Sequence, residues 1–152
     1  IRISDDIIAS GIASSVMPAR CELIRKKPVV ILDGGHNEGC AEALSDFIDK
    51  HLKGRRIIMV SSMMADKDYN SYLKKVAPYA NVFIATKADV PRALSSDELC
   101  DAAKPFCADC HSIPEPDKAI NAAHNITEDN DALIVCGSFY LAGEIRDVLI
   151  NF

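Results

Sequence analysis

Short apolar runs alternate along the chain with longer segments whose apolar residues recur every three or four positions. Runs of four or five aliphatic residues are too short for a typical helix and predict buried strands. We expect four such strands at Val29–Leu32, Ile57–Val60, Val82–Ala85 and Ala132–Cys136, with an edge strand at Cys21–Arg25 and a short strand at Cys110–Ile113.

The segments between these runs carry helical stripes. The clearest stripe begins after Asn37, which resembles an N-cap, and ends at Gly54. Further helices are predicted around residues 69–76, 96–104 and 117–126 and after Ser138. Because strands and helices alternate, and the strands are continuously apolar, the pattern predicts a doubly wound α/β domain. Its sheet should be mostly parallel, with helices on both faces.

The N-terminal segment has a different pattern. In residues 3–16, isoleucines and a valine recur at helical spacing after Asp5 and Asp6, which would lie in the first turn of a helix. Pro18 then ends this helical pattern. The chain begins without a methionine. We therefore interpret residues 1–16 as a linker helix from an upstream domain, and residues 17–152 as the domain itself.

Composition narrows the function classes. The chain has 152 residues, 49% of them hydrophobic and 26% charged, and a formal net charge of -5. These values fit a single globular domain, and the acidic balance argues against a general nucleic-acid surface. No apolar stretch is long enough for a membrane span, and no signal-peptide pattern is present, so we expect a cytoplasmic protein.

The six cysteines do not form a dense disulfide framework, and several fall within apolar patterns. We interpret them as small core residues in a reducing compartment. Cys107-Ala-Asp-Cys110-His111 has the spacing of covalent haem attachment, but neither an export signal nor a haem-binding helical fold accompanies it. A zinc site would need further ligands at matching spacing.

Polar residues follow three of the predicted strands, and carboxyl ends of parallel strands share one edge of a sheet. These residues are Asp33, His36 and Asn37, then Asp66, Lys67 and Asp68, and finally Gly137 and Ser138. Arg20 precedes the edge strand and offers a donor fork suited to phosphate. Neither a Gly-x-x-x-x-Gly-Lys-Ser/Thr loop nor a Gly-x-Gly-x-x-Gly pattern occurs, so the chain cannot cradle a triphosphate alone by either route.

Four motifs in order resemble the C-terminal domain of folylpolyglutamate synthase, within the Mur ligase family. They are Met17-Pro-Ala-Arg-Cys-Glu22, Ile31-Leu-Asp-Gly-Gly-His-Asn37, Met64-Ala-Asp-Lys-Asp68 and Val135-Cys-Gly-Ser-Phe-Tyr140. Two positions depart from the family pattern. Ala19 stands where the family usually has glycine, which makes a positive φ less favourable, and Glu38 stands where it usually has proline, which could repel a phosphate.

The resemblance implies an ATP-dependent ligase that adds glutamate to a folate through an acyl phosphate, with or without dihydrofolate synthase activity. It assigns Arg20 and Asp33 to ATP, Arg20 toward phosphate and Asp33 toward the ribose. It assigns His36, Asn37, Lys67 and Ser138 to glutamate. The phosphate loop, the Mg²⁺ ligands and the folate site would lie mainly on an upstream P-loop ATPase domain, so the isolated domain should be inactive.

Simpler interpretations remain open. Lys67 could be a solvated loop charge, Ser138 only an N-cap, and His36 a turn residue. The whole chain could also be a non-catalytic nucleotide-binding or regulatory module, since the fold permits it. That alternative does not explain Arg20 or the Gly-Ser-Phe-Tyr loop, and the upstream reading frame would distinguish the two.

Overall fold

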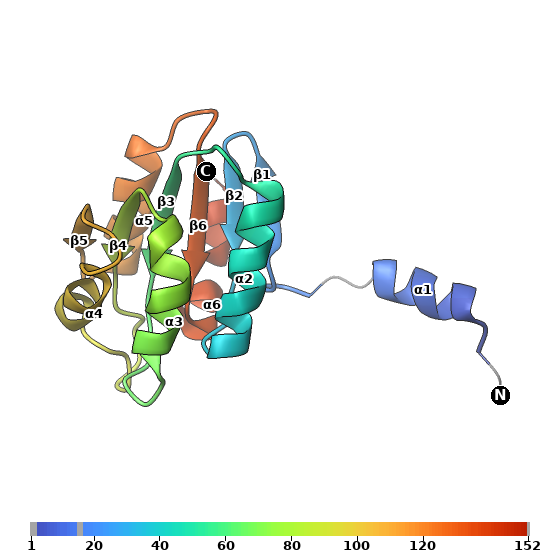
Figure 1. The fold of residues 1–152 in the computed structure, drawn as a ribbon, viewed down its shortest axis with the longest axis horizontal. Coiled ribbons are helices and arrows are strands. Elements are labelled where there is room, and N and C mark those ends of the chain that lie inside the picture. The colour runs from blue at the N-terminus through green and yellow to red at the C-terminus, as the bar shows by residue number, and fades with distance from the viewer. Residues whose placement is uncertain (1–2, 15–16, 152) are drawn as a thin grey trace.

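The computed structural model describes residues 3–14 and 17–151. Figure 1 shows a central sheet with helices packed in front of it and behind it. The strands are β1 (Glu22–Lys26), β2 (Val29–Leu32), β3 (Ile57–Ser61), β4 (Val82–Ala85), β5 (Cys110–Ser112) and β6 (Ala132–Cys136). Their order is β1-β2-β6-β3-β4-β5, and every neighbouring pair is parallel except β1 with β2. The predicted mostly parallel sheet with an edge strand before β2 is confirmed.

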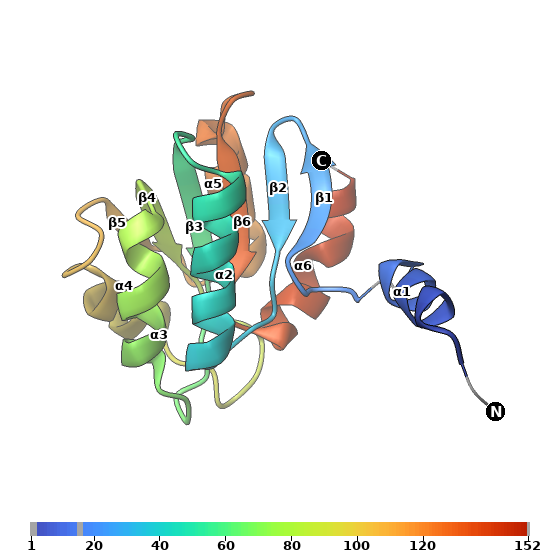
Figure 2. The same ribbon diagram turned by 45° about the vertical axis from the view of Figure 1, so that its right-hand side comes forward.

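Helices cover both faces of the sheet, as Figure 2 shows from a second side. One face carries α2 (Glu38–His51), α3 (Tyr69–Val76), which continues into a short 3₁₀ helix (Ala77–Tyr79), and α4 (Ser96–Ala103). The other face carries α5 (Pro116–Ile126) and α6 (Phe139–Ile150). Neighbouring strand residues point to opposite cores: Ile134 packs with the first group and Val135 with the second. The doubly wound architecture is therefore confirmed.

The N-terminal helix α1 (Asp5–Ser14) stands apart from this body in both views. Its Ile7 and Ile8 side chains are 65% and 47% exposed. The side chain of Ile12 and all of Val16, which the predicted stripe included, lie outside the described residues. The role of α1 as a linker helix stays a prediction. In the described part of the chain, no helix has the length and apolar character needed to cross a membrane.

Polar side chains cap the helices α2 and α3, which follow β2 and β3. The Asn37 side chain accepts a hydrogen bond from the Cys40 amide at 2.9 Å, as the sequence predicted. Asp68 caps α3 in the same way by accepting from the Ser71 amide at 3.0 Å. These caps fix where α2 and α3 begin, at the ends of the loops that leave the carboxyl ends of β2 and β3.

Gly137 makes the sharpest of these turns, between β6 and α6. Its φ is +95°, and a Cβ built there would lie 2.6 Å from the Ser62 carbonyl oxygen. Any larger residue would adopt a strained backbone and also collide with the neighbouring β3 loop.

We predict that Gly137→Ala lowers the free energy of unfolding by about 2–3 kcal/mol, since backbone strain and a steric clash combine. Gly143→Ala is the matched control, because Gly143 lies inside α6 and a Cβ there meets nothing within 4 Å. The control should gain up to about 1 kcal/mol from helix propensity. Urea denaturation measures the free energy of unfolding of both variants. If Gly137→Ala were as stable as Gly143→Ala, this account of Gly137 would be contradicted.

A second constraint ties the edge strand β1 to α6. The Arg146 guanidinium donates to both carboxylate oxygens of Glu22, with Nη2 2.6 Å from Oε1 and Nε 3.1 Å from Oε2. The Glu22 side chain is only 14% exposed and also accepts from the Ala19 amide at 2.9 Å. These hydrogen bonds, chiefly the one from Arg146, lower the pKa of Glu22 below its ordinary value of 4.5.

The lowered pKa predicts a pH dependence of stability. A carboxyl whose pKa is lower in the folded state stabilises the fold above its unfolded pKa and loses this effect as pH falls through the folded value. Glu22→Gln should therefore be less stable than the wild type at pH about 7, and the difference should shrink below pH about 4.5. Chemical denaturation across pH tests this.

The control for the pH series is Asp46→Asn, which removes an exposed carboxylate 3.9 Å from Lys50. Exposed pairs contribute little, so this variant should follow the wild type at every pH. A stability difference for Glu22→Gln that stays constant from neutral to acid pH would show that the carboxylate charge is not responsible.

Candidate functional site

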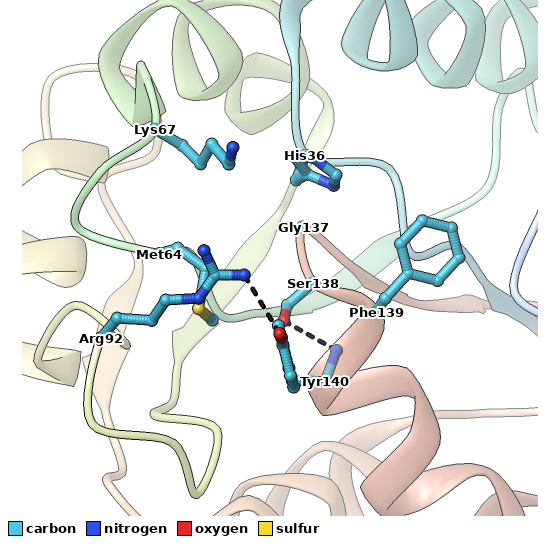
Figure 3. A pocket seen from close by; sticks show the side chains of 8 residues that line it. All are labelled: His36, Met64, Lys67, Arg92, Gly137, Ser138, Phe139 and Tyr140. Carbon is cyan, nitrogen blue, oxygen red and sulfur yellow. Dashed lines mark hydrogen bonds between the residues drawn. The ribbon is translucent and has the colours of Figure 1, made fainter.

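The carboxyl ends of the parallel strands open into a pocket of about 260 Å³. Figure 3 shows the residues that line it, which come from the loops after β2, β3, β4 and β6 and from the first turn of α6: His36, Met64, Lys67, Arg92, Gly137, Ser138, Phe139 and Tyr140. Three of the predicted glutamate-binding residues, His36, Lys67 and Ser138, thus share one pocket, as the parallel topology requires.

The loops that carry Lys67 and Arg92 are held together by backbone pairing. Met64 and Ala93 form an antiparallel bridge, and the Ala65 amide donates to the Arg92 carbonyl at 2.9 Å. This pairing brings Arg92 into the pocket as a second cation beside Lys67.

Arg92 is also oriented by its side-chain contacts. Its Nη2 donates to the Tyr140 hydroxyl at 3.1 Å, and its Cζ lies 5.2 Å from the centre of the Tyr140 ring. Its Nη1 lies 3.4 Å from Asp66 Oδ2, and Lys67 Nζ lies 3.8 Å from the same oxygen. Two cations therefore share one exposed carboxylate, which leaves excess positive charge for an anionic ligand.

The N-terminus of α6 forms the adjacent wall. The hydroxyl of Ser138 accepts from the Tyr140 amide at 3.1 Å and the Leu141 amide at 3.3 Å, so the predicted N-cap is confirmed. Ser138 is 2% exposed. The partial positive charge at the start of this helix adds to that of the two side chains and favours a carboxylate or phosphate.

Phe139 lines the pocket and also contacts Arg20. The ring of His36 meets the Phe139 ring edge-on with centroids 6.2 Å apart, while the Arg20 Cζ lies 4.6 Å from the Phe139 centroid. Arg20 is exposed and is not among the lining residues. The Phe139 ring lies so close to Gly34 that a Cβ there would overlap it, which explains the need for glycine.

Asp33 holds the turn that presents Arg20. Its carboxylate is 6% exposed and accepts from the Cys21 amide at 2.9 Å and the Gly35 amide at 2.8 Å. The turn is strained, with φ of +56° at Ala19 and +42° at Cys21. Ala19 thus adopts the positive φ that its side chain makes less favourable than it would be for glycine. Burial and the nearby carboxylate raise the pKa of the Cys21 thiol to about 12.

Asn37 and Glu38 make their contacts outside the pocket. Asn37 does not line it, and its side chain is occupied in capping α2. The carboxylate of Glu38 lies 3.4 Å from Lys75 Nζ, which compensates the charge expected to repel a phosphate.

The described residues hold no ready-made metal-binding cluster of side chains. Among residues 3–14 and 17–151, no group of three or more His, Cys, Asp or Glu side chains could hold a metal. The residues that line the pocket contribute cations and a helix N-terminus, which suit anions.

Sequence reasoning missed Arg92, Phe139 and Tyr140 as individual site residues. Arg92 carries no motif in the sequence, although it follows β4, the strand beside β3, and so reaches the same edge. Phe139 and Tyr140 were part of a motif, but the pattern gave no sign that their rings would contact Arg20 and Arg92.

Comparison with known proteins gives concordant results. Residues 19–139 match the family described as Mur ligase, glutamate ligase domain. The dihydrofolate synthase/folylpolyglutamate synthase of Bacillus subtilis is 31% identical over 144 residues, which cover 95% of this chain and 33% of that protein. The chain thus spans about a third of the length of this relative and of those from Escherichia coli and Lacticaseibacillus casei.

Solved structures share the fold. Escherichia coli FolC in complex with DHPP and ADP is 26% identical, with a TM-score of 0.89 over 98% of this chain and 35% of that one. Mycobacterium tuberculosis folylpolyglutamate synthase complexed with ADP is 25% identical, with a TM-score of 0.89. That match covers 97% of this chain and 36% of the other. On the family match and these likenesses together, the chain belongs to the Mur ligase family, as a glutamate ligase domain.

Proposed function

We propose that this chain is the glutamate-binding part of an ATP-dependent ligase that joins glutamate to a folate. The observation that carries the proposal is the pocket in which Lys67, Arg92 and the N-terminus of α6 surround one space. The curated relatives named folylpolyglutamate synthase support the reaction class. In this reaction the γ-carboxyl of the folate is activated as an acyl phosphate, and the amine of glutamate displaces the phosphate.

The charge pattern of the pocket suits the two carboxylates of glutamate. In the proposed arrangement, Lys67 and Arg92 bind the carboxylates as cations, and the partial positive charge at the N-terminus of α6 attracts one of them. His36 lines the opposite wall, beside Phe139, and limits the orientation of the ligand. Fixing both carboxylates leaves the amine as the group directed at the acyl phosphate.

We assign Arg20 to the phosphates of ATP. It is exposed, it is presented by a turn that Asp33 fixes, and its guanidinium stacks on the outer side of the amino-acid pocket. Relatives solved with ADP support a nucleotide as a ligand of such enzymes. The carboxylate of Asp33 accepts two backbone hydrogen bonds and so holds the turn that carries Arg20. Asp33 would keep this structural role while it contacts the ribose. Mg²⁺ would be held mainly by an upstream domain.

The proposal predicts that glutamate and ATP binding can be weakened separately in the full-length enzyme. Lys67→Ala or Arg92→Ala should raise the KM for glutamate by about ten- to a hundredfold, because each removes a hydrogen bond to a charged group. The KM for ATP should stay within about threefold. Arg20→Ala should do the reverse. Steady-state kinetics with each substrate varied in turn measures both effects.

Lys118→Ala and Arg55→Ala are matched controls, because these cations lie outside the pocket and pair with Glu115 and with the Asn130 carbonyl. Both should leave the two Michaelis constants unchanged. If Lys67→Ala weakens ATP and glutamate equally, it acts through domain closure rather than as a glutamate ligand, and the assignment is wrong.

A further prediction concerns the 152-residue chain on its own. It should fold but show no folate-dependent ATP hydrolysis, because it contains neither a phosphate-loop motif nor, in the part described, a metal-ligand cluster. A coupled phosphate-release assay with ATP, Mg²⁺, folate and glutamate tests this. Turnover above that of a heat-denatured sample would refute the proposed division between domains.

A further inference from the structure

Three of the six cysteines gather at the edge of the sheet that β5 forms, and none of them lines the pocket. Cys100 lies on α4, Cys110 begins β5, and Cys107 lies in the segment between them. The Cys107-Ala-Asp-Cys110 spacing would pair Cys107 with Cys110. The structure pairs them differently, because the Sγ atoms of Cys100 and Cys110 are 3.0 Å apart.

Cys107 is held elsewhere by its own hydrogen bonds. Its thiol donates to the Ala80 carbonyl at 3.3 Å or to the Asp109 carbonyl at 3.4 Å. The Cys110 thiol instead lies 3.4 Å from the Cys100 carbonyl oxygen as well as beside the Cys100 sulfur. All three cysteines are free thiols. Of the three pairs that these cysteines could form, the sulfur–sulfur contact therefore favours Cys100 with Cys110.

We propose that Cys100 and Cys110 form a thiol–disulfide exchange site that takes a low-molecular-weight disulfide, such as glutathione disulfide, as its oxidant. The half-buried Cys110 attacks first, forms a mixed disulfide and releases one glutathione thiol. The buried Cys100 then attacks Cys110 Sγ and releases the second. Two protons and two electrons pass to the oxidant, and the new bond joins α4 to β5.

The geometry needs little rearrangement for this bond. The sulfur atoms must approach by about 1 Å to reach the usual disulfide separation, which side-chain rotation can supply. Burial and the adjacent Cys100 thiol raise the pKa of Cys110, while the ammonium of Lys104 acts in the opposite direction. Because the thiolate is the nucleophile, exchange should be slow at neutral pH and faster in alkaline solution.

The crosslink should stabilise the domain. It closes a loop of about ten residues, which by the chain-entropy relation raises the folding equilibrium constant on the order of a hundredfold. The oxidised protein should therefore unfold at higher urea concentration, and a reducing agent should reverse the shift.

The test uses the purified chain in a glutathione redox buffer at a pH of about 8.5, near the ordinary thiol pKa. Samples are quenched with acid, the remaining thiols are alkylated, and the products are identified by intact mass and non-reducing peptide mapping. We expect a Cys100–Cys110 peptide and the loss of two alkylatable thiols. A Cys107–Cys110 peptide, or no internal disulfide with glutathione disulfide in excess, would overturn the proposal.

Variants define the order of attack. Cys100→Ala should accumulate a glutathione adduct on Cys110 that cannot resolve, and its urea midpoint should not respond to the oxidant. Cys107→Ser is the matched control and should oxidise like the wild type. Internal disulfide formation in Cys100→Ala at the same rate as in the wild type would show that Cys100 is not the resolving thiol. Peptide mapping of the wild type decides the pairing even if a variant fails to fold.

Discussion

The parallel pairing of β2, β6, β3 and β4 is the constraint on which the rest of the structure depends. Each of these strands is short and buried on both faces, so its backbone must be paired and its side chains covered by helices. The register places the carboxyl ends of the strands side by side. Val135 of the central strand β6 pairs with Leu32 of β2 on one side and with Val60 of β3 on the other. Four loops consequently open at one edge, where they form a single pocket.

Within that edge, cations lie both in the pocket and against the ring of Phe139, which lines it. The guanidinium of Arg20 stacks against the ring of Phe139. Phe139 belongs to the first turn of α6, and this turn lines the pocket together with Lys67 and Arg92. The turn that presents Arg20 depends on the buried carboxylate of Asp33, which fixes two amides. A shared wall between two cationic surfaces is a suitable arrangement for a ligase that must bring an amino acid to a phosphorylated partner.

The sequence predicted most of the fold because its signals were local. Continuous apolar runs specified the buried strands, and Asn37 and Ser138 marked helix starts that the structure confirms. The grouping of His36, Lys67 and Ser138 also followed from the topology. Contacts between distant side chains left no such signal. The approach of Arg92 to Tyr140, the pairing of Glu38 with Lys75 and the contact of Cys100 with Cys110 all depend on tertiary packing.

The most direct test of the central claim is a structure of the full-length enzyme with L-glutamate and a non-hydrolysable ATP analogue. We expect the glutamate to lie in the pocket, with its carboxylates within hydrogen-bond distance, about 3 Å, of Lys67 and Arg92. The triphosphate should lie on the Arg20 side of Phe139. Glutamate bound with no contact to Lys67, Arg92 or the N-terminus of α6 would contradict the account.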